Sequence, residues 1–136
     1  MRNITHTASR ALFNDGSMKR DNTEVIGTMN AGYKYSTMYL HSHPVALYYE
    51  SANIFRISNC AYMTNTTKER LNGVLHHAHL NGLIPQLYIY QRDFDWYISN
   101  YHHSIRWSYL TKYGDLNSIR DSTYIDSRDL LREFVF

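Results

Sequence analysis

The sequence predicts an α+β domain: an antiparallel β-meander and a later hairpin packed by one central amphipathic helix, plus short terminal helices. Three observations lead to this prediction. Apolar residues recur along 71–78 with the i, i+3, i+4 and i+7 spacing of one helical face. Residues 33–40 alternate between two faces with the period of a strand. The strand-like segments before the helix are joined by short turns, as in a meander of hairpins.

The central helix is expected over 65–81. Thr66 is followed three residues later by Glu69, which has the form of a capping box in which each side chain satisfies a free backbone donor. Asn81 and Gly82 supply a left-handed stop. The helix is therefore predicted to pack its apolar face on the sheet.

The N-terminal half is expected to hold a short helix, a loop and four strands. The helix covers 5–14, with Thr5 or Thr7 as its cap and Gly16 at its stop. The polar segment 17–23 is expected to be a loop. The four strands are expected at 24–29, 33–40, 45–49 and 54–58.

After the central helix, 87–90 and 96–98 form a compact hairpin. A helix is expected over 105–113, closed by Gly114, and a last helix with an aspartate cap near Asp126 or Asp129. The chain is accordingly divided into an α+β core domain, 1–99, and a C-terminal helical extension packed on the core, 100–136. The apolar end at 134–136 is expected to dock on the body or on another subunit, and a homodimer is one expectation.

Composition excludes several classes of protein. Hydrophobic residues at 43% and charged residues at 19% exclude global disorder. The single cysteine, Cys60, cannot form an internal disulfide, and no apolar run approaches the ~20 residues of a membrane span. The net charge of +2 is too small to indicate nucleic-acid binding by itself and argues against an acidic DNA mimic.

Tyrosine is unusually abundant, with 13 residues against five phenylalanines and two tryptophans. Tyrosine combines a large apolar face with a polar tip, which suits half-exposed surfaces and interfaces. The alternative is that tyrosine is simply favoured in strands.

One candidate ligand-binding site lies at the start of the central helix. Lys68 and Arg70 sit in its first turns, where free N–H groups and the helix dipole favour anions such as phosphate. Tyr62 could stack on a base there, and Arg56 could reach the same region. The alternative is that Lys68 pairs locally and that the threonines act only as caps.

A candidate partner-binding surface combines charge with aromatic side chains. Arg92 and Phe94 lie at the hairpin tip, and Arg106 and Trp107 follow it. Phe94 and Trp107 could equally belong to the core. Such a surface could also hold single-stranded nucleic acid.

The eight histidines suggest two further chemistries. His76 and His79 share one side of the helix and could hold zinc, but the spacings of the usual zinc motifs are missing. His41 and His43, with the pair 102–103, could supply general acid and base for phosphodiester cleavage, yet no nucleophile or carboxylate motif accompanies them. No catalytic residue, metal or cofactor is therefore assigned, and a histidine-dependent hydrolase is kept as a minor hypothesis.

Several blocks of the sequence carry a family resemblance. They are Asn22-Thr23-Glu24-Val25, Leu40-His41 with Val45-Ala46, Ile57-Ser58-Asn59-Cys60, 65–73, and Ile89-x-Gln91-x-Asp93-Phe94-x-Trp96-Tyr97. Over 3–99 the chain resembles a family of small proteins of unknown function from tailed bacteriophages, including T7-like phages of enteric bacteria. It departs from the family at Ser42-His43 and Ala61-Tyr62, and the segment after 100 has the character of an extension.

The resemblance implies a small phage accessory protein, made early and acting on the host in the bacterial cytoplasm. We therefore expect it to bind and neutralise a host component, as an anti-defence or host-takeover inhibitor. The target is either a host protein or a host nucleotide signal that the protein sequesters. The alternative is a nucleic-acid-binding domain.

Overall fold

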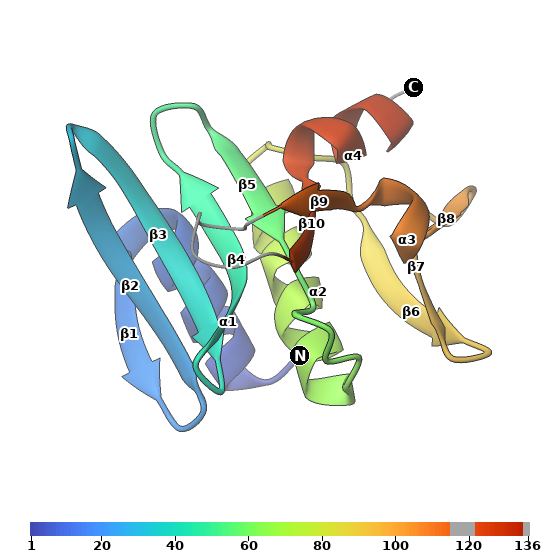
Figure 1. Ribbon diagram of the computed structural model, residues 1–136, viewed down its shortest axis with the longest axis horizontal. Coiled ribbons are helices and arrows are strands. Elements are labelled where there is room, and N and C mark those ends of the chain that lie inside the picture. Colours follow the sequence, from blue (N-terminus) through green and yellow to red (C-terminus); the bar gives the residue numbers. More distant parts are fainter. Residues whose placement is uncertain (115–121, 135–136) are drawn as a thin grey trace.

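The computed structural model describes residues 1–114 and 122–134 and confirms the α+β class. A seven-stranded and a three-stranded antiparallel sheet lie on either side of a central helix, α2 (Asn65–Leu80) (Figure 1). The large sheet has the order β1 (Ser17–Arg20), β2 (Thr23–Asn30), β3 (Tyr33–Leu40), β4 (His43–Tyr49), β5 (Ile54–Ile57), β10 (Ser122–Asp126), β9 (Lys112–Gly114). The small sheet has the order β6 (Tyr88–Arg92), β7 (Asp95–Ser99), β8 (Ser104–Arg106). The other helices are α1 (Asn3–Arg10), which continues as a π-helical turn over Ala11–Asp15, α3 (Trp107–Leu110) and α4 (Ser127–Phe134).

The expected meander of four strands is confirmed. Its first two connections are two-residue turns, and Ala31 and His41 take positive φ there, as hairpins with this loop length require. The expectation of a loop at 17–23 is wrong, because β1 pairs with β2 from Ser17 to Arg20. The polar side chains of this edge strand face solvent, and this gives it the composition of a loop.

The central helix is confirmed, and its four expected apolar residues are all fully buried: Leu71, Val74, Leu75 and Ala78. Its cap differs from the expectation. Thr64, not Thr66, accepts the hydrogen bond from the backbone of Thr67. Glu69 does not complete a capping box, because its carboxylate accepts from the Thr5 hydroxyl and the Arg70 guanidinium. The expected stop is confirmed, with Gly82 at a φ of 76°.

The N-terminal helix crosses α2 at very short range. A Cβ built on Gly73 of α2 would lie 2.3 Å from the Thr5 methyl group and 2.8 Å from the Ser9 hydroxyl, so only glycine fits here. The helix begins at Asn3, and Thr5 is fully buried inside it, so the expected caps at Thr5 or Thr7 are wrong. The expected stop at Gly16 is confirmed by its φ of 70°.

The segment after residue 100 contributes to both sheets. The expected helix over 105–113 is wrong, because β8, the short α3 and β9 occupy this stretch. The last helix is confirmed with Asp126 as its cap, since the Asp126 carboxylate accepts from the Arg128 backbone at 2.9 Å. Phe134 is buried on the body, and the rest of the apolar end lies outside the described residues. The division of the chain at residue 99 stays a prediction.

Candidate functional site

The outer face of the small sheet carries a row of tyrosines. Alternation along β6 and β7 turns Ile89, Trp96 and Ile98 inward, each no more than 3% exposed. The tyrosines between them point outward and are half-buried. They are Tyr88, Tyr90 and Tyr97, and Tyr101 follows after the end of β7.

These rings touch one another from strand to strand. Tyr90 and Tyr97 stack, with 5.3 Å between ring centroids and 14° between ring planes. Tyr88 lies 5.9 Å from the Tyr90 ring and 5.2 Å from the Tyr101 ring. The Tyr90 hydroxyl donates to the Ser104 hydroxyl on β8 at 3.0 Å. The row is therefore a pre-ordered aromatic surface across β6 and β7, joined to β8 by the Tyr90–Ser104 hydrogen bond.

Arg106 extends this row at the edge strand β8. Its guanidinium carbon lies 5.9 Å from the Tyr97 ring centre and 5.7 Å from that of Tyr109, which is 77% exposed on α3. Its Nη2 is 3.5 Å from the Tyr97 hydroxyl and 3.9 Å from an Asp95 carboxylate oxygen. The contact with Tyr97, and then the charge of Asp95, raise the pKa of Arg106. Arg106 thus presents a permanent positive charge beside two aromatic faces.

The hairpin tip presents one fully exposed apolar ring. Asp93 and Phe94 form the two-residue turn between β6 and β7, with φ of 51° and 67°. Phe94 is 89% exposed in this left-handed conformation, which costs a residue with a Cβ roughly 1–2 kcal/mol. A large apolar side chain that is both strained and exposed is characteristic of a functional position.

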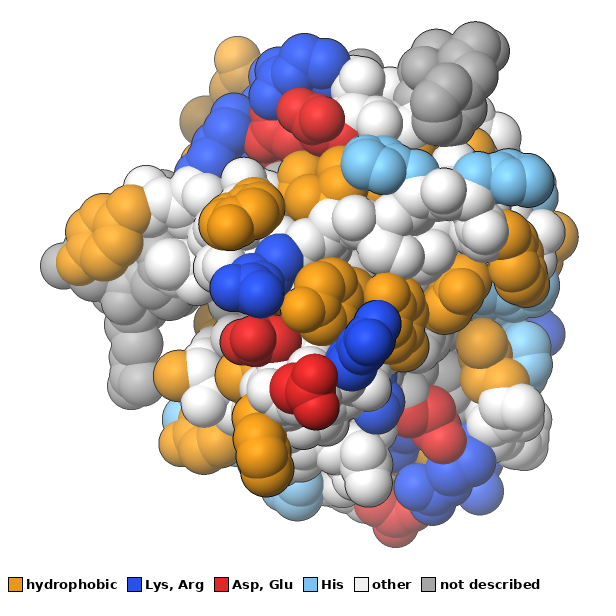
Figure 2. Space-filling model, turned by 90° about the vertical axis from the view of Figure 1, so that its right-hand side faces the viewer, with side chains coloured by type: hydrophobic (Ala, Val, Ile, Leu, Met, Phe, Trp, Pro, Cys, Tyr) orange, Lys and Arg blue, Asp and Glu red, His pale blue; other side chains and the backbone are white. Residues whose placement is uncertain are grey.

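Charges on this face nearly cancel. The basic Arg92 and Arg106 each lie 3.9 Å from an acidic neighbour, Asp93 and Asp95 respectively. Both pairs are long and open to solvent, so they contribute little to stability. Figure 2 shows hydrophobic side chains near the centre of this face, with blue and red groups between them.

A cavity of about 450 Å³ lies beside the edge strand β8. It is open to solvent, and it is lined by the whole of β8, by Tyr109 and Leu110 of α3 and by Glu133 of α4. The cavity adjoins the tyrosine face, because Tyr97 also lines it.

Three of the four expected partner-binding residues come together on this side of the molecule: Arg92, Phe94 and Arg106. Trp107 does not, because it is 6% exposed and packs edge-on against Trp96, with ring centroids 5.3 Å apart. Sequence reasoning missed the tyrosine row. The sequence pattern that indicates this row is the alternation of Tyr88 and Tyr90 with inward-facing residues, followed by Tyr97 on the next strand.

The structure does not bring the four expected ligand-binding residues together. Arg70 is 1% exposed and donates to Thr5 at 2.7 Å, to Glu69 at 2.6 Å and to Thr23 at 3.1 Å. Burial lowers the pKa of Arg70, and Glu69 counteracts this effect. The guanidinium is therefore held inside the protein through its Nε and Nη1 atoms.

The other three expected ligand-binding residues lie elsewhere. The ring centroid of Tyr62 lies 4.7 Å from that of His43. Lys68 is half-buried on α2. Arg56 belongs to β5, where its guanidinium carbon lies 5.5 Å from the Tyr49 ring centre and 4.8 Å from that of Tyr124. The roles of these residues in ligand binding stay predictions.

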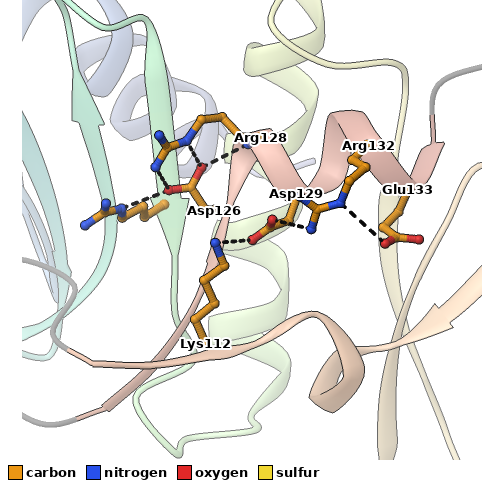
Figure 3. A network of polar contacts seen from close by, with 7 residues as sticks. Lys112, Asp126, Arg128, Asp129, Arg132 and Glu133 are labelled. Atoms are coloured by element: carbon orange, nitrogen blue, oxygen red, sulfur yellow. Dashed lines mark hydrogen bonds and ion pairs between the residues drawn. The ribbon is translucent and has the colours of Figure 1, made fainter.

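Arg56 takes part in a polar network that joins β5, β10 and α4 (Figure 3). The buried Asp126 accepts from Arg56 at 3.1 Å and from the Arg128 guanidinium at 2.9 Å. Burial alone would raise the pKa of Asp126, but the hydrogen bonds from Arg128 and Arg56 outweigh it and bring the pKa to about 2. In the same network Asp129 pairs with Lys112 and Arg132. The network fixes the C-terminal helix on the large sheet.

The histidines are spread over several elements. His6 on α1 and His77 on α2 have ring nitrogens 3.0 Å apart, and the His76 ring is near both. Burial, and then the charges of His6 and His76, lower the pKa of His77. The His79 ring contacts the Ile84 carbonyl instead. Within the part of the chain that the structure describes, no group of three or more His, Cys, Asp or Glu residues could hold a metal ion.

The candidate acid and base of a hydrolase lie on different sheets. His41 is at the turn between β3 and β4, and His43 begins β4. The second pair, at 102–103, lies between β7 and β8.

No helix among the described residues combines the length and apolar character that crossing a bilayer requires.

Comparison with known proteins identifies the family of the chain. The family model of the Kyanoviridae Gp96 protein matches residues 1–115, so the match extends past residue 99. No match was found among curated proteins or among solved structures. Kyanoviridae are cyanophages, so the expected origin in T7-like phages of enteric bacteria is wrong, whereas the expectation of a phage protein family is confirmed. Because the match covers well over half of the chain, the protein belongs to the Kyanoviridae Gp96 protein family.

Proposed function

We propose that this cyanophage protein is an accessory factor that binds and neutralises a host protein inside the infected cell. Its binding surface is the tyrosine face of the small sheet, extended by Arg106 and Phe94. The observation that carries the proposal is the row of touching tyrosines across β6 and β7, which the hydrogen bond from Tyr90 to Ser104 joins to β8.

The composition of this face matches that of protein interfaces. Tyrosine and arginine are enriched at interface hot spots, because each buries a large area and still offers hydrogen bonds. The rings of Tyr88, Tyr90 and Tyr97 already hold one another in place, so a partner would lose little side-chain entropy on ordering them. The strained and exposed Phe94 would supply an apolar anchor at one end.

Single-stranded nucleic acid is the second candidate, because stacked tyrosines beside an arginine also suit bases and phosphates. The charges on the face favour a protein. Tight binding of a phosphate chain requires several lysines or arginines, yet two aspartates accompany the two arginines of this face. Sequestration of a nucleotide signal is less favoured, because it rested on Arg56, Tyr62, Lys68 and Arg70, and Arg70 is buried in contacts with Thr5, Thr23 and Glu69.

A capture experiment from the lysate of a cyanobacterial host tests the proposal. Tagged protein should retain a host protein both with and without nuclease treatment, and Tyr97→Ser and Phe94→Ser should each abolish that capture. Tyr33→Ser is the matched control, because Tyr33 is 66% exposed but lies on β3 in the other sheet. Capture that survives both small-sheet substitutions would refute this surface. Capture that disappears with nuclease would instead support the nucleic-acid alternative.

A further inference from the structure

The two edges of the small sheet differ in how they are closed. At the β6 edge, the Asn72 side chain of α2 pairs with the strand, accepting from the Ile89 N–H at 2.6 Å and donating to the Ile89 carbonyl at 3.0 Å. At the other edge, β8 pairs with β7 alone among the strands in the described residues. The β8 edge is therefore the open one.

The register shows which backbone groups are on this open edge. The Asn100 N–H donates to the His103 carbonyl, and in an antiparallel ladder hydrogen-bonded pairs alternate with non-bonded pairs. Ile98 and Ile105 are thus the next bonded pair, and Ser99 and Ser104 are a non-bonded pair. The N–H and C=O groups of Ser104 consequently point away from β7.

The cavity of about 450 Å³ lies against this strand. Tyr109 and Leu110 give it apolar walls, while His103 and Arg106 place basic groups in it. Glu133 is its acidic wall residue and lies 3.9 Å from Arg132. The guanidinium of Arg106 contacts the Tyr97 hydroxyl at 3.5 Å, and its ion pair with Asp95 is likewise long, at 3.9 Å, and exposed. An open strand edge, apolar walls and an exposed arginine whose nearest carboxylate oxygen among the described residues is 3.9 Å away together suit an extended segment with an acidic side chain.

We propose that the host protein inserts an extended acidic segment beside β8 as a fourth strand of the small sheet, a mode that rests on the proposed function. The segment exchanges backbone hydrogen bonds with Ser104 and places an aspartate or glutamate carboxylate on Arg106. Its alternate apolar side chains contact Tyr109 and Leu110.

Selection from a displayed library of short random peptides tests this mode without the host protein. The selected peptides should share an acidic residue within an alternating apolar pattern. Ser104→Pro removes the N–H that points away from β7, a change that edge strands tolerate, together with the hydroxyl that accepts from Tyr90 and that Ser104→Ala also removes. It should weaken binding of a selected peptide about tenfold, whereas Ser104→Ala, which keeps the N–H, should not. Arg106→Glu should weaken it at least as much.

A second measurement keeps the test valid if Ser104→Pro does not fold. Methylation of the peptide's own backbone nitrogens, one position at a time, should abolish binding at alternate positions and be tolerated between them. Failure to select any peptide, or a peptide whose affinity survives both Arg106→Glu and the methylation scan, would overturn the edge-strand mode. Host capture without peptide binding would refute this mode and leave the proposed function standing. Peptide binding without host capture would support the mode and refute the function.

Discussion

Replacing Gly73 by alanine should destabilise this protein, although the same exchange on an exposed helix is stabilising. Gly73 lies on α2 where α1 crosses it. A Cβ there would be 2.3 Å from the Thr5 methyl group, whereas ordinary van der Waals contact is 3.4–4 Å. The two helices would have to separate by roughly 1 Å, a larger shift than a close-packed interior absorbs without strain.

The magnitude follows from two opposing effects. Alanine gains about 1 kcal/mol over glycine in intrinsic helix propensity. Overpacking costs roughly 1–3 kcal/mol, and displacing Thr5 also weakens its hydrogen bond with the buried Arg70, which at 2.7 Å is worth roughly 1.5–3 kcal/mol. We therefore expect Gly73→Ala to lower the free energy of unfolding by about 2 kcal/mol in total.

Urea denaturation of the purified chain measures this change. Thr5→Ser offers a specific rescue, because it removes the clashing methyl group and keeps the hydroxyl that binds Arg70. The Ser9 hydroxyl, which would lie 2.8 Å from the new Cβ, has no hydrogen-bond partner among the described residues and can rotate away. The reasoning fails if Gly73→Ala is as stable as the parent, or if Thr5→Ser does not reduce the loss.

Three further predictions concern pH and the hairpin tip. The pKa of His77 is lowered below the ordinary 6.5, so the unfolded chain binds more protons and stability should fall as the pH drops below 6.5. His77→Gln should flatten this dependence in thermal unfolding. The pKa of Asp126 is about 2 instead of 3.8, so its contribution of about 2 kcal/mol is present above pH 3.8 and disappears toward pH 2. Asp126→Asn should lose that amount in urea denaturation at neutral pH, and a similar loss near pH 2 would contradict this origin. Phe94→Gly should add about 1 kcal/mol to the unfolding free energy by relieving strain at the turn while it abolishes host capture, and unchanged stability would argue against strain.

Local signals in the sequence were sufficient to predict the elements whose residue pattern depends only on neighbours in the sequence. The apolar face of α2, its stop at Gly82 and the alternation along β3 depend on neighbours within a few positions. The cap of α2 was decided by distant contacts. Both Thr64 and Thr66 suit the cap position, but Glu69 is drawn to Thr5, far away in the sequence, so the capping box does not form.

Only some residues of the candidate binding surface could be predicted from the sequence. Arg92, Phe94 and Arg106 carry the charge and aromatic character of a binding surface in the sequence itself. The tyrosine row depends on the register between β6, β7 and β8, which no single strand reveals. The burial of Trp107 against Trp96 was equally hidden, because tryptophan occurs in cores and on interfaces alike. Arg70 has the sequence position of an anion-binding residue, yet its side chain points into the protein rather than toward the free N–H groups of the helix.

The pairing of Asn72 with Ile89 has a consequence for stoichiometry. A side-chain amide occupies the place of a neighbouring strand and ends the small sheet on that side. The small sheet therefore offers one open edge per molecule, so copies of the protein cannot join edge to edge in series through this sheet. Each molecule would thus engage one target chain through this sheet, and the amount of protein made would set the number of targets held.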